Sequence, residues 1–427
     1  MQAAVSTAGV VDVERPRGGV SMFCAAGFKA VEIDFLQFYD AAMPEEGECF
    51  REKAQNAAWA RMREIRENPR VLAAYAEALF SACRSAGLSP AIARAPFRRH
   101  GSGRSGQEGL LLALAKECVG ICGKAGCFYL VVRPLEADDG RGGAWEANRA
   151  FYLELARAAE GTAVQILLEN ECAVFSGRLV RGVCAEPEEA AAWIDRLNAA
   201  AGAERFGFCF DVGAANLCGQ DMRESIVTLG NRVKAVRMRD CDGRYEASLL
   251  PFTALRQGCL TDWRSVVWGL REIDFDGLLL YDIAGTASAF PVLLRPYVLT
   301  LAQKTAAYFD WVLQIEAKLQ KYRSIVLFGA GNMCKNYMAF YGEKYPPLFT
   351  CDNDRSLWGT RVHGLLVKPP EALQTLPAGC GVFVCNMYYR EIERQLKEMG
   401  VGPVAFFNDE YLPPQSWAAL KEDGQRC

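Results

Sequence analysis

Residues 206–240 have the sequence FGFCFDVGAANLCGQDMRESIVTLGNRVKAVRMRD, which predicts one strand–helix–strand unit. The first part is apolar and aromatic up to Asp211, a pattern typical of a buried strand that ends on a carboxylate. In the last part, apolar residues alternate with Arg237 and Arg239, and this period of two indicates a strand with two different faces. Because a helix separates the two strands, we expect them to run parallel.

The same alternation of strands and helices covers the chain from its first residues to about residue 300. Eight strand-like runs occur in series: AAVST near residue 3, KAVEIDF from residue 29, SPAIARAPF from 89, CFYLVVRP from 127, VQILLENE from 164, FGFCFDVG from 206, VKAVRMRD from 233 and GLLLYDI from 277. Such a series predicts an α/β fold, a closed (β/α)8 TIM barrel over residues 1–300. An insertion at residues 36–68 contains a polar helical part, which we expect either over the barrel opening or packed on its rim.

A second series of alternating strands and helices begins after residue 320. Residues 301–321 are amphipathic at the helical period and end in a charged run, which predicts a helical linker. The apolar run SIVLF, residues 324–328, then leads into a glycine-containing turn and a helix. Residues 322–427 therefore predict a small Rossmann-like domain built on a parallel sheet.

The composition is that of an ordinary globular protein. Of the 427 residues, 51% are hydrophobic and 23% are charged, and the formal net charge is −3. With a pI near 5.8 the chain has no overall basic field, so we expect no nucleic-acid partner. The N-terminus shows no secretory leader and charges interrupt the most apolar stretch, so we expect a cytoplasmic protein without a membrane span. The 17 cysteines then predict reduced thiols packed as small apolar groups.

Charged residues cluster where the predicted strands end. Period-two alternation puts them on the inward face, at the barrel mouth, where the carboxyl ends of the strands meet. The carboxylates of this group are Glu32, Asp34, Glu169, Glu171, Asp211 and Asp282, and the arginines are Arg94, Arg133, Arg237 and Arg239. Buried charges need a counter-charge or a metal ion, so this set is too large for an ordinary core and predicts a functional site.

The segments LLENE, FCFDVGAAN with CGQD, VKAVRMRDCDG, LLPF with GCLTDW, and FDGLLLYDI resemble the xylose-isomerase-like sugar-phosphate isomerases and epimerases. The resemblance spans nearly the whole predicted barrel. It implies a divalent metal, Mn²⁺ or Mg²⁺, held by Glu169, Asp211 and Asp282, and a sugar or sugar-phosphate substrate. It also implies that Glu169 and Asp282 carry a proton to and from the carbon beside a carbonyl while the metal stabilises the enediolate.

The chain departs from this family at the histidines. Where the family usually has histidine, this sequence has Arg94, Arg133, Ala214, Arg237 and Arg239. The whole chain contains two histidines. Arginine has no available lone pair and stays protonated, so it does not replace a histidine as a metal ligand.

Three interpretations of the barrel mouth follow. In the first, Glu169, Asp211 and Asp282 still hold a hard ion together with water, and the protein is a sugar isomerase or epimerase. In the second, the four arginines, with Glu32, bind an anionic sugar or a nucleotide-sugar directly, and catalysis is optional. In the third, the charges form only a structural salt-bridge network on an inherited fold. The first is our leading hypothesis and the second is its rival, and either is compatible with a homo-oligomer.

The C-terminal part carries an incomplete dinucleotide-binding fingerprint. Gly329 and Gly331 lie where a strand-to-helix turn brings backbone amides close to a phosphate. Cys334 replaces the third glycine, while Asp352 falls at the end of the next strand, where an acidic residue can bind a ribose hydroxyl. With CDND, WGTRVHGLLVKPPEAL and VFVCNMYYREIERQL, this turn resembles the truncated Rossmann-like domains of sugar-modifying and polysaccharide-related enzymes. That resemblance implies a bound nucleotide, and a structural or partner-docking role is the alternative.

Overall fold

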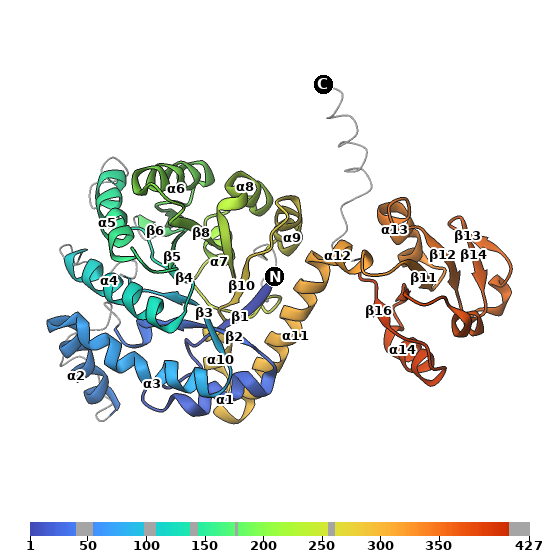
Figure 1. Cartoon of the computed structure of the whole chain (residues 1–427), viewed down its shortest axis with the longest axis horizontal. Coiled ribbons are helices and arrows are strands. Elements are labelled where there is room, and N and C mark those ends of the chain that lie inside the picture. The colour runs from blue at the N-terminus through green and yellow to red at the C-terminus, as the bar shows by residue number, and fades with distance from the viewer. Residues whose placement is uncertain (40–53, 98–107, 137–143, 176–177, 255–260, 410–427) are drawn as a thin grey trace, which may run out of the picture. The chain divides into compact units, whose positions relative to one another are not determined.

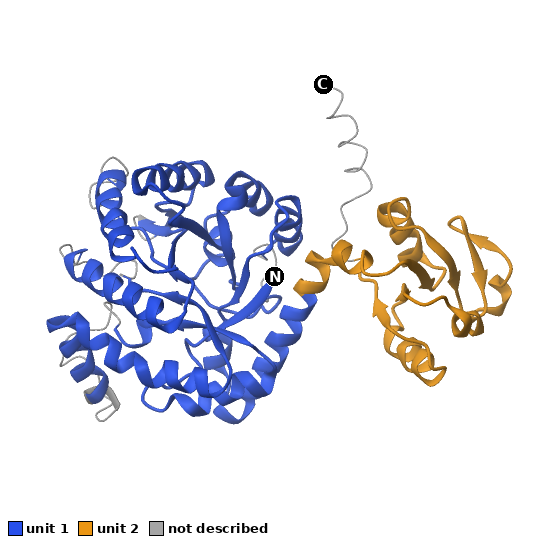
Figure 2. Cartoon of the chain, viewed as in Figure 1, with its two compact units in different colours: residues 1–308 blue, residues 309–427 orange. Residues whose placement is uncertain are grey.

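The computed structural model describes residues 1–39, 54–97, 108–136, 144–175, 178–254 and 261–409. The chain divides into two compact units, which we call unit 1, residues 1–308, and unit 2, residues 309–427 (Figure 2). Each unit contains hydrophobic clusters of its own. The two units are therefore described separately.

Unit 1 is a closed barrel of eight strands, as the sequence predicts (Figure 1). Around the barrel the strands follow the order β1-β10-β9-β8-β5-β4-β3-β2, and every neighbouring pair is parallel. Their bounds are β1 Gln2–Ser6, β2 Ala30–Asp34, β3 Ser89–Arg94, β4 Tyr129–Val131, β5 Gln165–Glu169, β8 Phe206–Asp211, β9 Val233–Met238 and β10 Leu278–Tyr281. All eight predicted runs form strands of the barrel, which confirms the fold class.

Helices connect these strands and form the outer layer of the barrel (Figure 1). Their bounds are α1 Pro16–Ala26, α3 Leu72–Ser85, α4 Glu108–Ala125, α5 Ala144–Ala158, α6 Pro187–Ala201, α7 Val212–Leu217, α8 Met222–Leu229, α9 Trp263–Glu272, α10 Ala284–Ala289 and α11 Arg295–Leu313. Local sequence sets where several helices begin: Asp262, for example, caps α9 by accepting a hydrogen bond from the Ser265 amide at 3.0 Å. Within the described parts of the chain, no helix combines the length and the apolar run that crossing a bilayer requires.

A layer of apolar side chains fills the middle of the barrel. It contains at least one residue from each strand, and all are buried: Ala4, Ala30, Ile92, Val131, Leu167, Cys209, Ala235, Leu278 and Leu280. Successive side chains of a strand point to opposite faces, so the residue two positions further along each strand also points inward. The next layer toward the barrel mouth is therefore built by these second residues.

An antiparallel hairpin follows β5 directly and was not predicted from the sequence. It consists of β6, Cys172–Phe175, and β7, Arg178–Arg181. Gly182 lets the chain return past the start of the hairpin, because a Cβ atom there would lie 2.8 Å from the backbone oxygen of Glu171. The hairpin therefore stands beside the barrel mouth, next to the charged end of β5.

The predicted insertion after β2 contains helix α2, Ala54–Glu67, while its residues 40–53 lie outside the described part of the chain. Arg61 of this helix donates to the backbone oxygen of Phe38 at 3.4 Å and forms an ion pair with Glu14. Helix α2 is thus held against the segment that follows β2 and against the first loop of the barrel.

Unit 2 is built on a six-stranded sheet with the order β13-β14-β12-β11-β15-β16. The bounds are β11 Ser324–Phe328, β12 Pro347–Cys351, β13 Arg361–Val362, β14 Leu365–Lys368, β15 Cys380–Val384 and β16 Val404–Phe406, with helices α12 Ile315–Leu319, α13 Asn332–Tyr341 and α14 Tyr389–Glu398. The paired strands are parallel except β13 with β14. The central strand β11 is apolar on both faces, since Ile325 and Leu327 join one core cluster and Val326 and Phe328 join another.

Candidate functional site

The layer above the apolar one is charged on every barrel strand except β1, where Ser6 occupies the position. Its charged members, each two residues beyond a member of the apolar layer, are Glu32, Arg94, Arg133, Glu169, Asp211, Arg237 and Asp282. All of them are buried. Closure of the barrel thus points these side chains at one centre, at the end where barrels of this kind hold their functional sites.

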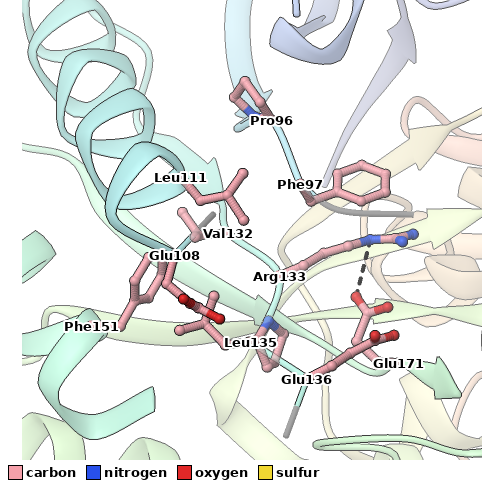
Figure 3. A pocket seen from close by; sticks show the side chains of 11 residues that line it. Pro96, Phe97, Glu108, Leu111, Val132, Arg133, Leu135, Glu136, Phe151 and Glu171 are labelled. Atoms are coloured by element: carbon pink, nitrogen blue, oxygen red, sulfur yellow. Dashed lines mark ion pairs between the residues drawn. The ribbon is translucent and has the colours of Figure 1, made fainter. Parts of the chain in front are cut away.

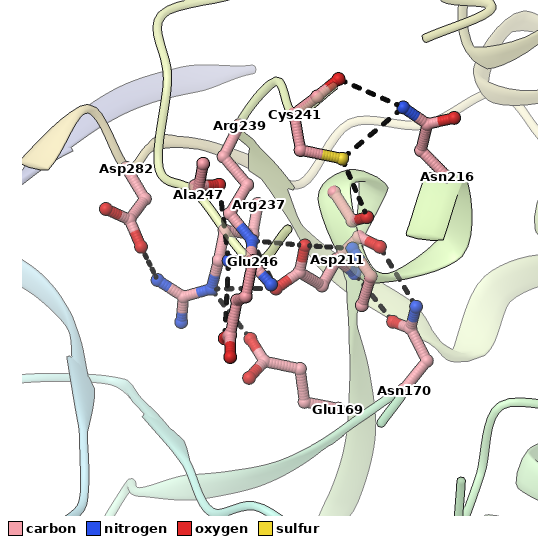
Figure 4. A network of polar contacts seen from close by, with 12 residues as sticks. Glu169, Asn170, Asp211, Asn216, Arg237, Arg239, Cys241, Glu246, Ala247 and Asp282 are labelled. Atoms are coloured by element: carbon pink, nitrogen blue, oxygen red, sulfur yellow. Dashed lines mark hydrogen bonds and ion pairs between the residues drawn. The ribbon is translucent and has the colours of Figure 1, made fainter. Parts of the chain in front are cut away.

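The guanidinium of Arg237 occupies the centre of this charged layer (Figure 4). Its Nη1 and Nη2 donate to the two carboxylate oxygens of Glu32 at 3.2 and 3.0 Å, and its Nε donates to Glu169 Oε1 at 2.7 Å. Asp282 Oδ2 lies 3.6 Å from Nη1, and Asp211 Oδ2 lies 3.9 Å from Nε. Arg237 is wholly buried, so four carboxylates converge on one organic cation.

Two further arginines pair with carboxylates at the edge of the layer. Arg239 Nε donates to both carboxylate oxygens of Asp211, at 2.8 and 2.9 Å. Arg94 Nη2 donates to Asp34 Oδ2 at 2.6 Å, and Arg94 Nη1 lies 3.8 Å from Asp282 Oδ2. These contacts bring together residues that the sequence placed on separate strands.

Glu169 is held from two sides. Arg237 Nε binds one of its oxygens, and Arg133 Nε binds the other at 2.9 Å. Arg133 Nε also lies 3.0 Å from Glu171 Oε1, and its guanidinium stacks over the ring of Phe97 at 3.9 Å from the ring centre. Both oxygens of Glu169 are therefore engaged with arginines.

Burial and counter-charge oppose each other in setting the pKa of each carboxyl group here. Burial raises the pKa of Glu169, but the charges of Arg237 and Arg133 outweigh it and hold that pKa well below its usual range. For Glu32, burial outweighs the nearby charge of Arg237, and the pKa is raised. Burial also raises the pKa of Glu171 well above its ordinary value, against the charge of Arg133. The layer therefore contains carboxyl groups with opposite shifts.

The three predicted metal ligands do not fit a divalent ion in this arrangement. Glu169 and Asp211 direct their oxygens at guanidinium groups, and Asp282 lies near Arg237 and Arg94. Among the described residues, no three histidine, cysteine, aspartate or glutamate side chains are placed to share a metal ion. A cation at the centre would have to displace the Arg237 guanidinium, which carries the charge that a metal would supply.

A cavity of about 470 Å³ lies over the charged layer at the barrel mouth. Its polar lining consists of Asp34, Gln37, Arg94, Arg239, Glu246, Ser248 and Asp282. Arg94 is 7% exposed, and its buried Nε has no hydrogen-bond partner among the described residues. An unmet donor on a buried guanidinium is unfavourable, so this side of the cavity is suited to a ligand or water oxygen.

Asp282, which directly follows β10, is the carboxylate of the charged layer that lines the cavity. Burial raises its pKa, but the charges of Arg94 and Arg237 outweigh burial and hold the pKa below its ordinary value. Asp282 is therefore ionised at neutral pH while it faces a space large enough for a small molecule. A carboxylate in this state accepts hydrogen bonds or a proton.

Apart from Arg133, the structure separates the predicted site residues of the barrel into two groups. Arg94, Arg239 and Asp282 line the cavity, whereas Glu32, Glu169, Asp211 and Arg237 lie beneath it and are fully buried. Sequence analysis missed Gln37, Glu246 and Ser248, which also line the cavity. Gln37 ends a short helix after β2, and the other two lie in the loop after β9, where no strand period indicates direction.

Arg133 lies beside a second, smaller cavity of about 40 Å³ (Figure 3). The lining is largely apolar and includes Phe97, Leu111 and Phe151, with Glu171 next to the arginine. This space is too small for a sugar, and Arg133 is engaged with Glu169 and Glu171. The larger cavity is therefore the candidate binding site.

In unit 2 the predicted nucleotide-binding residues lie at the carboxyl ends of β11 and β12. Gly329 has a φ of +116°, and a Cβ atom there would lie 2.5 Å from the backbone oxygen of Cys385, so this position requires glycine. Asp352 Oδ2 accepts a hydrogen bond from the Ala330 amide at 2.9 Å. Asp352 thus fixes the turn that contains Gly329 and Gly331, and nucleotide binding at this turn stays a prediction.

The fold and the site together define a parallel α/β barrel with a charged, partly closed mouth. The chain belongs to the xylose isomerase-like TIM barrel family, whose profile matches residues 25–291. This agrees with the resemblance seen in the sequence.

Solved structures that are similar to this chain have low sequence identity to it. A D-tagatose 3-epimerase-like protein is 16% identical, with 74% of this chain and 100% of that chain covered and a TM-score of 0.51. A D-psicose 3-epimerase solved with D-fructose is 12% identical over 73% and 99% of the two chains, with a TM-score of 0.49. The IolI protein, solved with a zinc atom, is 14% identical over 74% and 98%, with a TM-score of 0.48. No curated protein matches the chain.

Proposed function

We propose that the cavity at the barrel mouth binds a free, uncharged sugar, and that the protein is a sugar isomerase or epimerase that works without a bound metal. The observation that carries this proposal is the cavity of about 470 Å³ lined by Arg94, Arg239 and Asp282, in a barrel of the xylose isomerase-like family. The structurally similar proteins include epimerases solved with D-fructose and D-tagatose.

The charges of the cavity favour an uncharged ligand over a phosphorylated one. The lining offers two positive side chains, Arg94 and Arg239, against three acidic ones, Asp34, Glu246 and Asp282. In the layer beneath, Arg237 and Arg133 are each already paired with two carboxylates. A phosphate would therefore meet no surplus of positive charge, whereas neighbouring sugar hydroxyls can bind such alternating donors and acceptors.

The reaction requires a base beside the substrate carbon and a positive group beside the carbonyl oxygen. In the proposed arrangement Asp282 removes the proton next to the carbonyl, and the electrons move toward the carbonyl oxygen to form an enediolate. The guanidinium groups of Arg94 and Arg239 stabilise the developing negative charge. Asp282 then delivers the proton to the neighbouring carbon on the same face, while the proton of the neighbouring hydroxyl passes to the former carbonyl oxygen, so that the carbonyl group has moved by one carbon.

Glu169, the second base implied by the family resemblance, has a different part in this proposal. Its oxygens are bound to Arg237 and Arg133 beneath the cavity, so they are engaged away from the space where the substrate would lie. We therefore assign Glu169 to positioning the two arginines. Of the two bases that the family resemblance implies, Asp282 alone lines the cavity, and this favours isomerisation over epimerisation.

The test is proton exchange in D₂O with EDTA present. We expect deuterium to enter a free ketose or aldose from a panel that includes D-fructose and D-tagatose, and we expect Asp282→Asn to abolish this exchange. Asp195→Asn, which changes an exposed carboxylate on α6 paired with Arg232, serves as the matched control and should leave exchange intact.

Two results would overturn the proposal in different ways. Binding of a sugar, seen as a thermal shift, without any deuterium exchange would show a non-catalytic binding protein. Exchange that appears only after Mn²⁺ or Mg²⁺ is added, and disappears with EDTA, would show that the buried arginines move aside for a metal.

A further inference from the structure

Two cysteine sulfurs meet beside the barrel mouth. Cys172 is the first residue of β6, and Cys218 directly follows α7. Their Sγ atoms lie 3.3 Å apart, although 46 positions separate the two residues in the sequence. Both are free thiols, with Cys172 buried and Cys218 half-buried.

Backbone contacts hold both sulfurs in this position. Cys172 Sγ lies 3.5 Å from the backbone oxygen of Ala214 in α7, and Cys218 Sγ lies 3.6 Å from that of Val180 in β7. Cys172 also packs in a small cluster with Ala214 and Leu217, against which Cys218 is placed. Since a disulfide has an S–S distance of about 2.05 Å, the sulfurs need to approach by only about 1.3 Å, within reach of small side-chain rotations.

We propose that Cys172 and Cys218 form a reversible oxidation site, which becomes a disulfide by exchange with a small-molecule disulfide such as oxidised glutathione. The Cys218 thiolate attacks one sulfur of the oxidant and displaces one glutathione thiolate, which leaves a mixed disulfide. The Cys172 thiol then loses its proton and attacks the Cys218 sulfur, displacing the second glutathione. Two protein thiols are oxidised to one disulfide, and one oxidised glutathione is reduced to two thiols.

Cys218 is the attacking residue because it is accessible and because its thiolate is favoured. The hydrogen bond with the Cys172 thiol lowers the pKa of Cys218, and the charge of Arg181 lowers it further, while burial and the carboxylates of Asp211 and Glu186 oppose these effects. Arg181 Nε lies 3.5 Å from the backbone oxygen of Cys218, so a positive charge is held close to this residue. A thiol in such surroundings is the more reactive member of the pair.

The disulfide would fasten the β6–β7 hairpin to the end of α7. Asp211 caps helix α7: its Oδ1 accepts a hydrogen bond from the Ala214 amide at 3.0 Å and also binds Arg239. Asn170, just before the hairpin, exchanges hydrogen bonds with the backbone of Asp211 at 2.7 and 2.9 Å. Oxidation would therefore lock two segments that carry residues of the charged layer, and this inference does not depend on the proposed sugar chemistry.

Another pair of cysteines provides an internal comparison. The Cys122 and Cys127 thiols also contact each other, but both residues are buried in the barrel wall. Cys24 is half-buried like Cys218, and its sulfur faces the backbone oxygen of Ala86 at 3.4 Å. Access without a thiol at contact distance among the described residues, as at Cys24, predicts a mixed disulfide at most.

The test is to incubate the full-length native protein with oxidised glutathione, block free thiols, digest without reduction and identify cross-linked peptides by mass spectrometry. We expect a Cys172–Cys218 cross-link, reversed by dithiothreitol, and a melting temperature for unit 1 that is roughly 5 °C higher in the oxidised form. In Cys172→Ser we expect a stable glutathione adduct on Cys218, whereas the control Cys24→Ser should still form the cross-link.

The proposal is overturned if the native protein carries a lasting glutathione adduct on Cys218, because Cys172 would then not resolve it. It is also overturned if both thiols stay unmodified while Cys24 reacts, or if the cross-link joins Cys122 to Cys127 instead. These outcomes are read from the wild-type chain, so they hold even if a serine variant fails to fold.

Discussion

The apolar layer and the charged layer of the barrel are built by the same strands, two residues apart. Leu167 and Glu169 on β5, or Ala235 and Arg237 on β9, face the same interior and are equally buried. Apolar side chains in such a layer need only to fill the space, whereas each buried charge needs a counter-charge at hydrogen-bond distance. The comparison teaches that a substitution in the apolar layer costs the packing that is lost, whereas a substitution in the charged layer also leaves its buried partners without a counter-charge.

The largest effect is expected when the central cation is removed. Arg237→Met leaves Glu32 and Glu169 buried with fewer counter-charges, and we expect it to lower the free energy of unfolding of unit 1 by about 4 kcal/mol. Leu167→Ala, one layer below, should lower it by about 3 kcal/mol through lost burial and a cavity. Denaturant unfolding followed by circular dichroism measures both.

The control for the arginine is Arg232→Met, since Arg232 forms a partly exposed pair with Asp195. Its removal should change the free energy of unfolding by less than about 1 kcal/mol. If Arg232→Met and Arg237→Met lower the free energy of unfolding equally, then unpairing the buried central charge costs no more than unpairing a partly exposed one. The proposed difference between the two layers would then not hold.

A smaller effect is expected from pH, through Glu171. Burial raises the folded-state pKa of Glu171 well above its ordinary value of 4.5, so the folded state binds the proton more tightly than the unfolded state. The stability that this proton provides is fully present below the unfolded pKa and is lost as pH rises toward the folded pKa, by at most about 1.4 kcal/mol per pH unit.

Glu171→Gln removes this titration and keeps the size of the side chain. We therefore expect the melting temperature of the variant to fall less than that of the wild type when the pH is raised from about 5 to about 8. If the melting temperatures of the two proteins change with pH in parallel, Arg133 keeps Glu171 ionised in the folded state, as it helps to keep Glu169 ionised.

The smallest effect is expected in unit 2, where a carboxylate at a strand end has backbone partners. Asp352 accepts hydrogen bonds from the Ala330 and Asp354 amides, both at 2.9 Å. Asp352→Ala removes these bonds without leaving a buried charge, so we expect a loss of about 1 kcal/mol in the unfolding of unit 2. Hydrogen exchange at the Ala330 amide measures it, and a loss as large as that of Arg237→Met would contradict the comparison.

The residue types of the candidate site were predictable, but their contacts were not. Period-two alternation identified Glu32, Glu169 and Arg237 as inward-facing, because side-chain direction is a local property of the strand. It treated Arg237 and Arg239 alike, although the first is buried beneath the cavity and the second lines it. That difference depends on how far each strand end extends relative to its neighbours.

The sequence by itself determined the eight strands, their order along the chain and the charged residues that end them, because these follow from short-range patterns of apolar and polar side chains. Closure of the barrel decided that Arg237 of β9 reaches Glu32 of β2 at 3.0 Å, and that the predicted metal ligands meet a guanidinium. The tertiary structure also decided the loop residues of the cavity and the meeting of Cys172 with Cys218. Such contacts join segments distant in sequence, and strand register, barrel closure and loop paths bring them together.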